Sequence, residues 1–298
     1  MKSSVARWTI ALWCVIAFVS TTSAQIVSDD FNAFNLKPSI WTYTDPVGDA
    51  TLSLRGTNTS NAWLSIAVPG DSAHDLWTGG NNVPRIMQTA PDTDFEIEVK
   101  FASGVSAAYQ IEGIVAEQDA NNLIRFEFDG DGTNTNVFVA SFTGGFSSPA
   151  IQLGPLPIDQ VNVAPLWMRI NRSGSTWTVS YSVNGVTFST AGTFELPFTL
   201  HKIGLFAGND GTPVPAFTAL VDYFSNTAHP ITSEDGNTAV VDSIPPLAYA
   251  VHPSAAATRL TVNWKTDERA KGTLQYGTCA GRSRVAWRGW PRLMLFQA

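Results

Sequence analysis

Residues 94–101 read DFEIEVKF, and this stretch indicates the fold class of the whole chain. Its apolar residues stand at every second position with charged residues between them, which is the pattern of a β-strand with one buried face. The same alternation recurs in IRFEFD (124–129) and in WTVSYSV (177–183). Between residues 29 and 224 we find no long segment with a 3.6-residue period. The pattern predicts an all-β fold, an antiparallel jelly-roll β-sandwich.

Turn residues separate these runs. Asn184-Gly185 is the strongest short hairpin signal in the chain, because a type I′ turn needs a positive φ at both central residues. DGDG at 129–132 and Gly144-Gly145 mark two further turns. We therefore expect tight hairpins rather than long crossovers between neighbouring strands.

Composition narrows the class of protein. Of the 298 residues, 14% are charged, against about 25% in ordinary soluble proteins. A surface with so few charges must be built from Ser, Thr, Asn, Gln and Gly, which is common in secreted β-proteins. The formal net charge is −7. The chain therefore lacks the overall positive charge that grips phosphate backbones, and we expect no nucleic-acid partner.

Residues 1–24 have the pattern of a secretory signal peptide. Lys2 and Arg7 precede the apolar run 8–19, which is too short to span a bilayer. Small residues at 22–24 predict cleavage before Gln25, and an uncleaved signal anchor is the alternative. We expect a secreted, extracellular protein with no membrane span after cleavage. The second of the two cysteines, Cys279, would then stand alone, so we expect no intramolecular disulfide.

Several motifs in order carry a resemblance to a known superfamily. They are SDDF (28–31), DFEIEVKF (94–101), GIVAEQDANNLIRFEFDGDG (113–132), WMRINRSGSTWTVSYSVNGVTFST (167–190), HKIGLFAGN (201–209) and AFTALVDYF (216–224). Their order resembles the concanavalin A-like lectin/glucanase superfamily, and it is most similar to the sandwich modules related to the C-terminal domain of family 43 β-xylosidases. The resemblance implies one concanavalin A-like sandwich over 25–228. It implies little about activity, because this fold hosts lectins, hydrolases and structural modules.

The C-terminal part differs in character. Residues 229–242 are polar and aperiodic, as in a linker. Residues 243–278 resemble the first three strands of a fibronectin type III domain, a truncated and partial second β-sandwich, since such a domain needs about 90–100 residues. Residues 279–298 form a basic tail with four arginines and no acid. We interpret it as non-native sequence from a frameshift or a truncated gene model; a tail that binds nucleic acid or anionic lipid is the alternative.

Glu96 and Glu98 are candidate catalytic residues. Together with Asp94 they occupy one face of the predicted strand, with neighbours roughly 6–7 Å apart, a separation that glycosidase acid/base pairs use. The strand resembles the Glu-x-Asp-x-Glu strand of laminarinase-type glucanases, with the outer and central residues interchanged. The competing interpretation is an ordinary polar strand face that includes Lys100. We find no Gly-x-Ser-x-Gly elbow and no metal-binding spacing of the four histidines.

The segment HDLWTGGNN (74–82) is the candidate ligand-binding loop. An aromatic plane, amides and a guanidinium suit a sugar, and loops on a rigid sandwich often carry function. Glu117 and Arg125 could extend this site over a neighbouring sheet face. The alternative is that Trp77 plugs one end of the sandwich and the polar residues bond locally. The predicted ligand-binding residues are His74, Asp75, Trp77, Asn81, Arg85, Glu117 and Arg125.

Asp30 and Asp222 are candidate ligands of a structural calcium ion. The resemblance implies that the first and last strands lie side by side, where a cation can join them, and these residues match those positions. The expected function is a secreted, non-catalytic module of a larger multidomain protein that binds carbohydrate or another extracellular ligand. The alternatives are a glycoside hydrolase or its accessory domain, and a structural or adhesion spacer.

Overall fold

The computed structural model describes residues 25–231, except 58, 60, 78–79 and 158–162, and the backbone of five strands between 248 and 297. The predicted signal peptide (1–24) and most of the predicted linker (232–242) lie outside the described residues. In the described part of the chain, no helix is long and apolar enough to cross a membrane.

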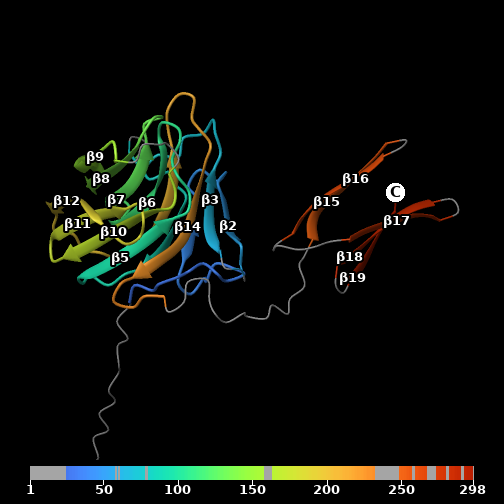
Figure 1. Ribbon diagram of the computed structural model, residues 1–298, viewed down its shortest axis with the longest axis horizontal. Coiled ribbons are helices and arrows are strands. Elements are labelled where there is room, and N and C mark those ends of the chain that lie inside the picture. The colour runs from blue at the N-terminus through green and yellow to red at the C-terminus, as the bar shows by residue number, and fades with distance from the viewer. Residues whose placement is uncertain are drawn as a thin grey trace, which may run out of the picture.

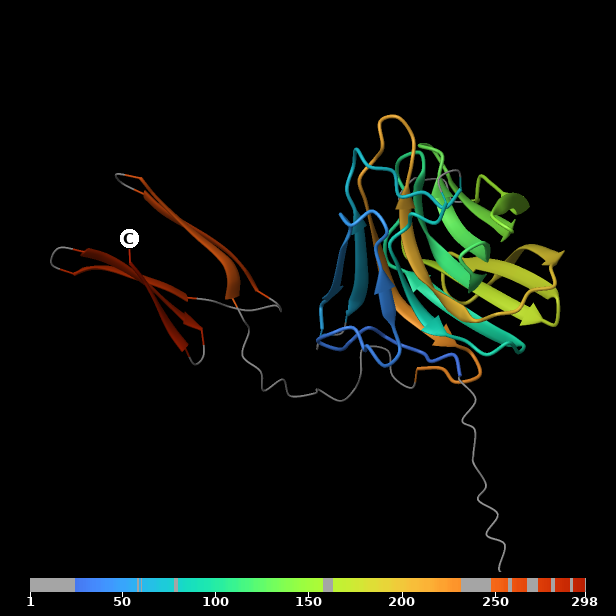
Figure 2. The ribbon, with the colours of Figure 1, turned by 180° about the vertical axis from the view of Figure 1, so that it is seen from behind.

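Two antiparallel sheets of seven strands face each other, so the predicted all-β sandwich is confirmed (Figures 1 and 2). Sheet 1 contains, in spatial order, β1 (Thr42–Thr44), β4 (Arg85–Thr89), β13 (Lys202–Asn209), β6 (Gln110–Asp119), β7 (Asn122–Gly130), β8 (Thr135–Thr143) and β9 (Phe146–Leu153). Sheet 2 contains β12 (Ser189–Glu195), β11 (Thr176–Ser182), β10 (Leu166–Ser173), β5 (Phe95–Phe101), β14 (Phe217–Asn226), β3 (Trp63–Val68) and β2 (Thr51–Arg55).

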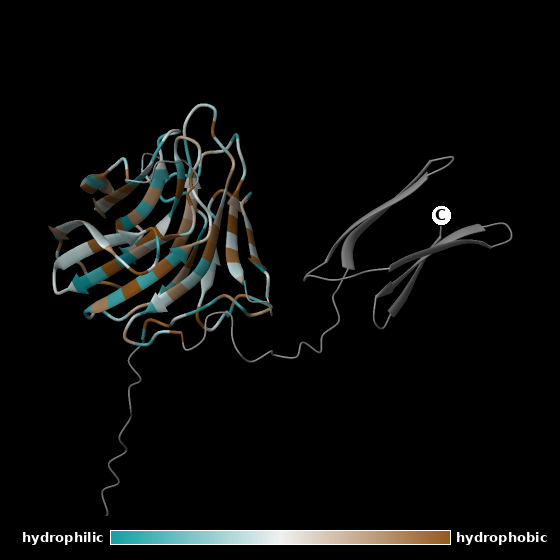
Figure 3. Cartoon of the chain, viewed as in Figure 1, coloured by the Kyte–Doolittle hydropathy of each residue, from teal (hydrophilic) through white to brown (hydrophobic). Residues whose placement is uncertain are grey.

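The core lies between the inner faces of the two sheets. The strand β5 spans the predicted alternating stretch, and its residues Ile97, Val99 and Phe101 are fully buried. Brown and teal residues alternate along the strands for the same reason, as Figure 3 shows. Trp177 of β11 is among the largest buried side chains, and its ring packs edge-on against Phe95 at 5.9 Å between centroids. Apolar burial of this kind is the main favourable term in folding.

The predicted hairpin at Asn184-Gly185 is wrong in its geometry. The strands β11 and β12 are joined by residues 183–188, and of the two central residues Gly185 alone has a positive φ. The Asn184 carboxamide oxygen instead accepts hydrogen bonds from the backbone of Val186 and Thr187, an Asx arrangement that competes with a tight turn.

The two-residue turn occurs between β8 and β9. Gly144 and Gly145 have φ values of +59° and +85°, which a type I′ turn requires. Two positions without a Cβ meet that requirement at no steric cost, which explains why this predicted turn is formed.

The ends of the sandwich domain are joined directly. Asp29 and Phe224 exchange two backbone hydrogen bonds. The chain around Asp29, at the start of the domain, therefore lies beside β14, as the resemblance implied. The buried Asp29 carboxylate accepts hydrogen bonds from the Phe31 amide, Lys37 and the Trp41 indole. This network fixes the entry of the chain into the sandwich.

The outer face of sheet 1 is covered by the chain itself. Leu76 and Val83, from the segment between β3 and β4, are buried in a second apolar cluster with residues of β4, β13, β6, β7 and β8. A Cβ built on Gly208 would lie 2.8 Å from the carbonyl oxygen of His74. The absence of a side chain at Gly208 therefore lets this covering segment (residues 69–84) approach the sheet closely.

Five strands follow in the C-terminal part. The strands β15 (Ala248–Ala256) and β16 (Arg259–Thr266) form an antiparallel pair. The strands β17 (Thr273–Cys279), β18 (Arg282–Gly289) and β19 (Arg292–Gln297) form a three-stranded antiparallel sheet. The fibronectin type III resemblance of this part and the origin of its last residues stay predictions.

Candidate functional site

The structure distributes the predicted ligand-binding residues over three neighbouring places rather than one. His74 is buried within the covering segment, and Asp75, Trp77 and Arg125 form a buried polar cluster. Arg85 and Glu117 line a cavity, and Asn81 accepts a hydrogen bond from Arg85.

His74 is a fully buried structural residue. Its Nδ1 lies 2.9 Å from the Asn209 side-chain oxygen, and its Nε2 lies 2.6 Å from the Asp49 carboxylate. The His74 backbone amide also donates to the Asn209 side chain at 2.9 Å. Because both ring nitrogens are used inside the protein, His74 anchors the covering segment to β13 and is not available to a ligand.

Arg125 of β7 is the centre of the buried polar cluster. It donates hydrogen bonds to the Leu76 carbonyl at 2.9 Å and to the Glu127 carboxylate at 2.8 Å. Its guanidinium lies 5.4 Å from the ring centroid of Trp77, and Asp75 lies 3.8 Å away. Burial raises the pKa of Glu127 to about 8, while Arg125 opposes that shift.

Trp77 packs edge-on against Phe138 and Phe142 of β8, at about 6 Å between ring centroids. Its ring therefore contacts two of the protein's own aromatic residues, and the Arg125 guanidinium lies over it. Trp77 is thus used by the fold, as in the alternative interpretation, but it packs on the outer face of sheet 1 and does not plug one end of the sandwich.

Arg85, Glu117 and Lys202 line a cavity of ≈ 180 Å³ at the β1 side of sheet 1. The Glu117 carboxylate lies 3.8 Å from Arg85 Nε and 3.8 Å from Lys202 Nζ. Both distances exceed a hydrogen bond, so these cations neutralise Glu117 without engaging its oxygens tightly. The other lining residues include Thr42, Thr44, Met87, Gln88 and Thr89.

The Arg85 guanidinium is held by hydrogen bonds to the covering segment. Its Nη1 donates to the Asn81 side-chain oxygen and to the Val83 carbonyl, both at 3.2 Å. Its Nε is buried and has no hydrogen-bond partner among the described residues, and the same holds for Asn81 Nδ2. Burial lowers the pKa of Arg85, and Glu117 opposes the shift. An arginine keeps its charge in such a site, so the cavity combines positioned donors with one carboxylate acceptor.

This geometry suits a ligand with adjacent hydroxyl groups. A carboxylate accepts from one hydroxyl while a guanidinium or ammonium donates to the next. Sequence reasoning found Arg85, Asn81 and Glu117 but missed Lys202. No local motif marks Lys202: it joins the site because β13 lies between β4 and β6 in the sheet.

Glu96 and Glu98 lie on the outer face of sheet 2, where Arg169 of β10 pairs with both. Arg169 Nη2 donates to the Glu98 carboxylate at 2.5 Å, and its Nε lies 3.8 Å from Glu96. Tyr223 donates its hydroxyl to Glu98 at 2.7 Å, and Asn171 donates to Glu96 at 3.3 Å. Neither carboxylate lines the cavity formed by Arg85, Glu117 and Lys202. Their contacts are those of a paired polar strand face.

The two predicted calcium ligands make different contacts. Asp222 lies 2.7 Å from the ammonium of Lys100, and Asp30 accepts a hydrogen bond from the backbone of Asn32. Within the described part of the chain, no group of three or more His, Cys, Asp or Glu side chains could hold a metal ion. The calcium ion therefore stays a prediction, without a donor set around Asp30 and Asp222.

A scan against protein-family models finds no match for this chain, and a search of curated proteins finds none. Solved structures share its fold. The GH43 protein BlXynB from Bacillus licheniformis has a TM-score of 0.50 and 18% identity, over 66% of this chain and 38% of that one. The Bacteroides ovatus xyloglucan PUL GH43B has a TM-score of 0.50 and 16% identity, over 68% and 39%.

The chain thus spans about two fifths of the length of these two structures. At such low identity the similarity shows the fold alone. It confirms the predicted fold resemblance to the sandwich regions of family 43 glycoside hydrolases.

Proposed function

We propose that the sandwich is a secreted, non-catalytic module that binds carbohydrate at the cavity formed by Arg85, Glu117 and Lys202. The observation that carries this proposal is the buried Arg85 Nε, which has no hydrogen-bond partner among the described residues. An unpaired buried donor costs about 1–3 kcal/mol. A ligand hydroxyl that displaces the side chains covering this nitrogen would recover that cost.

The fold supports the same proposal. Binding groups on strands are held more precisely than groups on loops, and here the three strands β4, β6 and β13 hold the three charged side chains. Low charge elsewhere on the surface agrees with an extracellular role in a larger, multidomain protein.

Retention of the full chain on insoluble xylan, β-glucan, arabinan and galactan tests the proposal. We expect retention on at least one of them. Glu117→Gln removes the charged acceptor, and Arg85→Ala removes the donors, so each should weaken binding by about tenfold. Glu195→Gln is the matched control for Glu117→Gln. Glu195 is an exposed carboxylate at the end of β12, it accepts hydrogen bonds from Ser175 and Thr176, and it does not line this cavity.

Failure to be retained on all four polysaccharides would overturn the proposal and favour a spacer or adhesion module. Release of reducing sugar from these polysaccharides, lost in Glu96→Gln or Glu98→Gln, would overturn the non-catalytic part and favour a glycoside hydrolase.

A further inference from the structure

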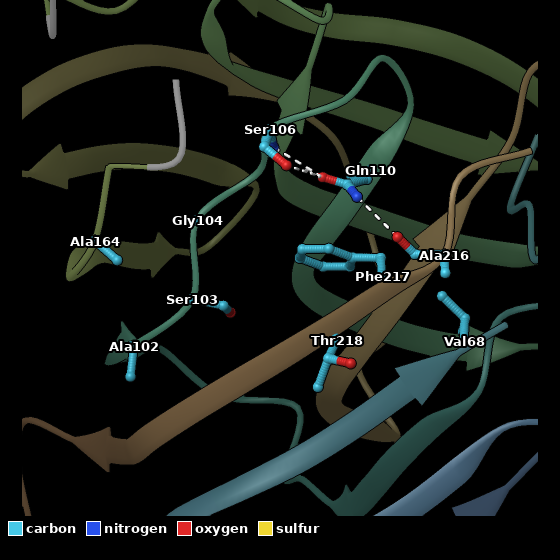
Figure 4. A pocket seen from close by; sticks show the side chains of 10 residues that line it. All are labelled: Val68, Ala102, Ser103, Gly104, Ser106, Gln110, Ala164, Ala216, Phe217 and Thr218. Carbon is cyan, nitrogen blue, oxygen red and sulfur yellow. Dashed lines mark hydrogen bonds between the residues drawn. The ribbon is translucent and has the colours of Figure 1, made fainter. Parts of the chain in front are cut away.

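A second cavity lies at the end of the sandwich where β3 and β5 end and β6 and β14 begin (Figure 4). Its volume is ≈ 410 Å³, within the range of about 300–1,000 Å³ that small-molecule sites occupy. No charged side chain is among the described residues that line it. The lining residues are Val68, Ala102, Ser103, Gly104, Ser106, Gln110, Ala164, Ala216, Phe217 and Thr218.

The wall of this end cavity is held in place by Gln110. Its side-chain oxygen accepts hydrogen bonds from the Ser106 amide at 2.8 Å and the Ala107 amide at 3.0 Å. Its side-chain nitrogen donates to the Ala216 carbonyl at 2.8 Å (Figure 4). Gln110 thus ties the loop after β5 to the segment before β14. The cavity is therefore preformed, which lowers the entropic cost of binding.

Ser103 lines the end cavity and is hydrogen-bonded to Glu112, a buried acid. Its hydroxyl contacts the Glu112 carboxyl group and also accepts from the Leu220 amide at 2.7 Å. Glu112 is fully buried on the inner face of β6, and its Oε1 has no hydrogen-bond partner among the described residues. Burial raises the pKa of Glu112 to about 8.

The protonation state of Glu112 decides what Ser103 offers to the end cavity. A protonated Glu112 can donate to the Ser103 oxygen, and the Ser103 hydroxyl hydrogen can then turn either to the Leu220 carbonyl, 3.4 Å away, or to a ligand. An ionised Glu112 must accept that hydrogen instead.

Among the described residues, the core around Glu112 contains the phenol of Tyr181, while the acids and bases of the neighbouring strands lie on the outer faces of the two sheets. Glu127 and Asp129 of β7 and Lys202 of β13 project from the outer face of sheet 1. Lys100 of β5 pairs with Asp222 of β14 on the outer face of sheet 2.

Tyr109, the residue before Gln110 in the sequence, has an exposed aromatic ring. Tyr109 is 56% exposed and has a φ of +63°. A Cβ on Gly211 would lie 2.9 Å from its ring, so the ring rests against that glycine. A non-glycine residue in the left-handed region is strained, and such strain concentrates at binding sites.

We propose that the end cavity is a second ligand site, and that it takes a small, uncharged, polyhydroxylated molecule such as a monosaccharide, with Ser103 and Thr218 as hydrogen-bonding groups. An uncharged lining of hydroxyls and backbone groups favours a neutral ligand that both donates and accepts. The site is separate from the Arg85 cavity, so either can exist without the other.

Saturation-transfer difference NMR on the full chain tests the site, with D-xylose, D-galactose and L-arabinose as probes at pH 6. We expect saturation transfer to at least one sugar, and a dissociation constant about tenfold higher in Ser103→Ala. Thr218→Val keeps the side-chain shape and should weaken binding in the same direction, which guards against a folding defect in Ser103→Ala. Glu195→Gln, at an exposed carboxylate that lines neither cavity, is the control and should keep this signal, and Arg85→Ala separates binding at the end cavity from binding at the Arg85 cavity.

Transfer to a sugar should also weaken as the pH rises from 6 to 9, and Glu112→Gln should remove that dependence. Three outcomes would overturn the site: no transfer to any of the three sugars, binding unchanged in both Ser103→Ala and Thr218→Val, or binding lost in Arg85→Ala alone. The last outcome would place the observed binding at the Arg85 cavity and leave the proposed function standing.

Discussion

Asp29 and Phe224 exchange backbone hydrogen bonds of 2.8 and 2.9 Å, although 195 positions separate them in the chain. The Asp29 carboxylate is buried beneath this pair and accepts from Lys37 at 2.8 Å and from the Trp41 indole at 2.9 Å. Closure of the sandwich domain thus depends on a carboxylate that the protein itself neutralises.

Asp29→Ala should therefore destabilise the fold by about 2–4 kcal/mol, because it leaves the Trp41 indole and the Phe31 amide without their acceptor. Asp30→Ala is the matched control. Asp30 is half-buried and accepts a 3.2 Å hydrogen bond from the Asn32 backbone, so its loss should cost less than about 1 kcal/mol. Urea unfolding of both variants measures the difference. Equal losses would show that the Asp29 network does not hold the domain closed.

Asp30→Ala also tests the predicted calcium ion. If Asp30 and Asp222 bind calcium, the melting temperature should rise with added calcium in the natural chain and not in Asp30→Ala. An unchanged melting temperature in both would refute the calcium prediction.

Glu112 and Glu127 should make the fold less stable as the pH rises. Burial raises the pKa of each carboxyl from 4.5 to about 8 in the folded state. The folded protein therefore binds these protons more tightly than the unfolded chain does. Their contribution to the free energy of unfolding is fully present below pH 4.5 and is lost as the pH rises to about 8.

Glu112→Gln should accordingly stabilise the protein at pH 8 and change little at pH 5, because glutamine resembles the protonated acid. Urea unfolding at both pH values measures this, with Glu195→Gln as an exposed control. A Glu112→Gln variant that is equally destabilised at both pH values would contradict the assignment.

Trp77→Ala should lower stability by about 2–4 kcal/mol, because the ring packs against Phe138, Phe142 and Arg125. Retention on polysaccharide should remain in the folded variant, since Trp77 does not line the Arg85 cavity. Thermal unfolding and the retention assay check the two parts separately. Lost retention with unchanged stability would instead support direct stacking of a sugar on Trp77.

Gly208→Ala should displace the covering segment, because the new methyl group would lie 2.8 Å from the His74 carbonyl oxygen. Overpacking against backbone costs about 1–3 kcal/mol. Limited proteolysis should then cut within residues 69–84 before the rest of the sandwich is cleaved. Unchanged protease resistance together with unchanged stability would show that this contact relaxes freely.

The sequence by itself determined the β-strands and the class of fold. Alternation in 94–101 places Ile97, Val99 and Phe101 inside, because consecutive side chains of a strand point to opposite faces. Gly144-Gly145 forms its predicted turn for an equally local reason, the absence of two Cβ atoms. Asn184-Gly185 does not, because the Asn184 side chain bonds the following backbone.

The candidate sites were decided by the tertiary structure. The sheet order β4-β13-β6 brings Arg85 of β4 and Glu117 of β6 to one cavity. The same order places Lys202 of the central strand β13 between them, although no local pattern marks Lys202. Ser103 gains its partner Glu112 through the packing of the loop after β5 against β6. His74 and Trp77, which suit a sugar by residue type, are used by the fold itself. Residue type is a local property, whereas availability depends on which distant strands and loops cover a side chain.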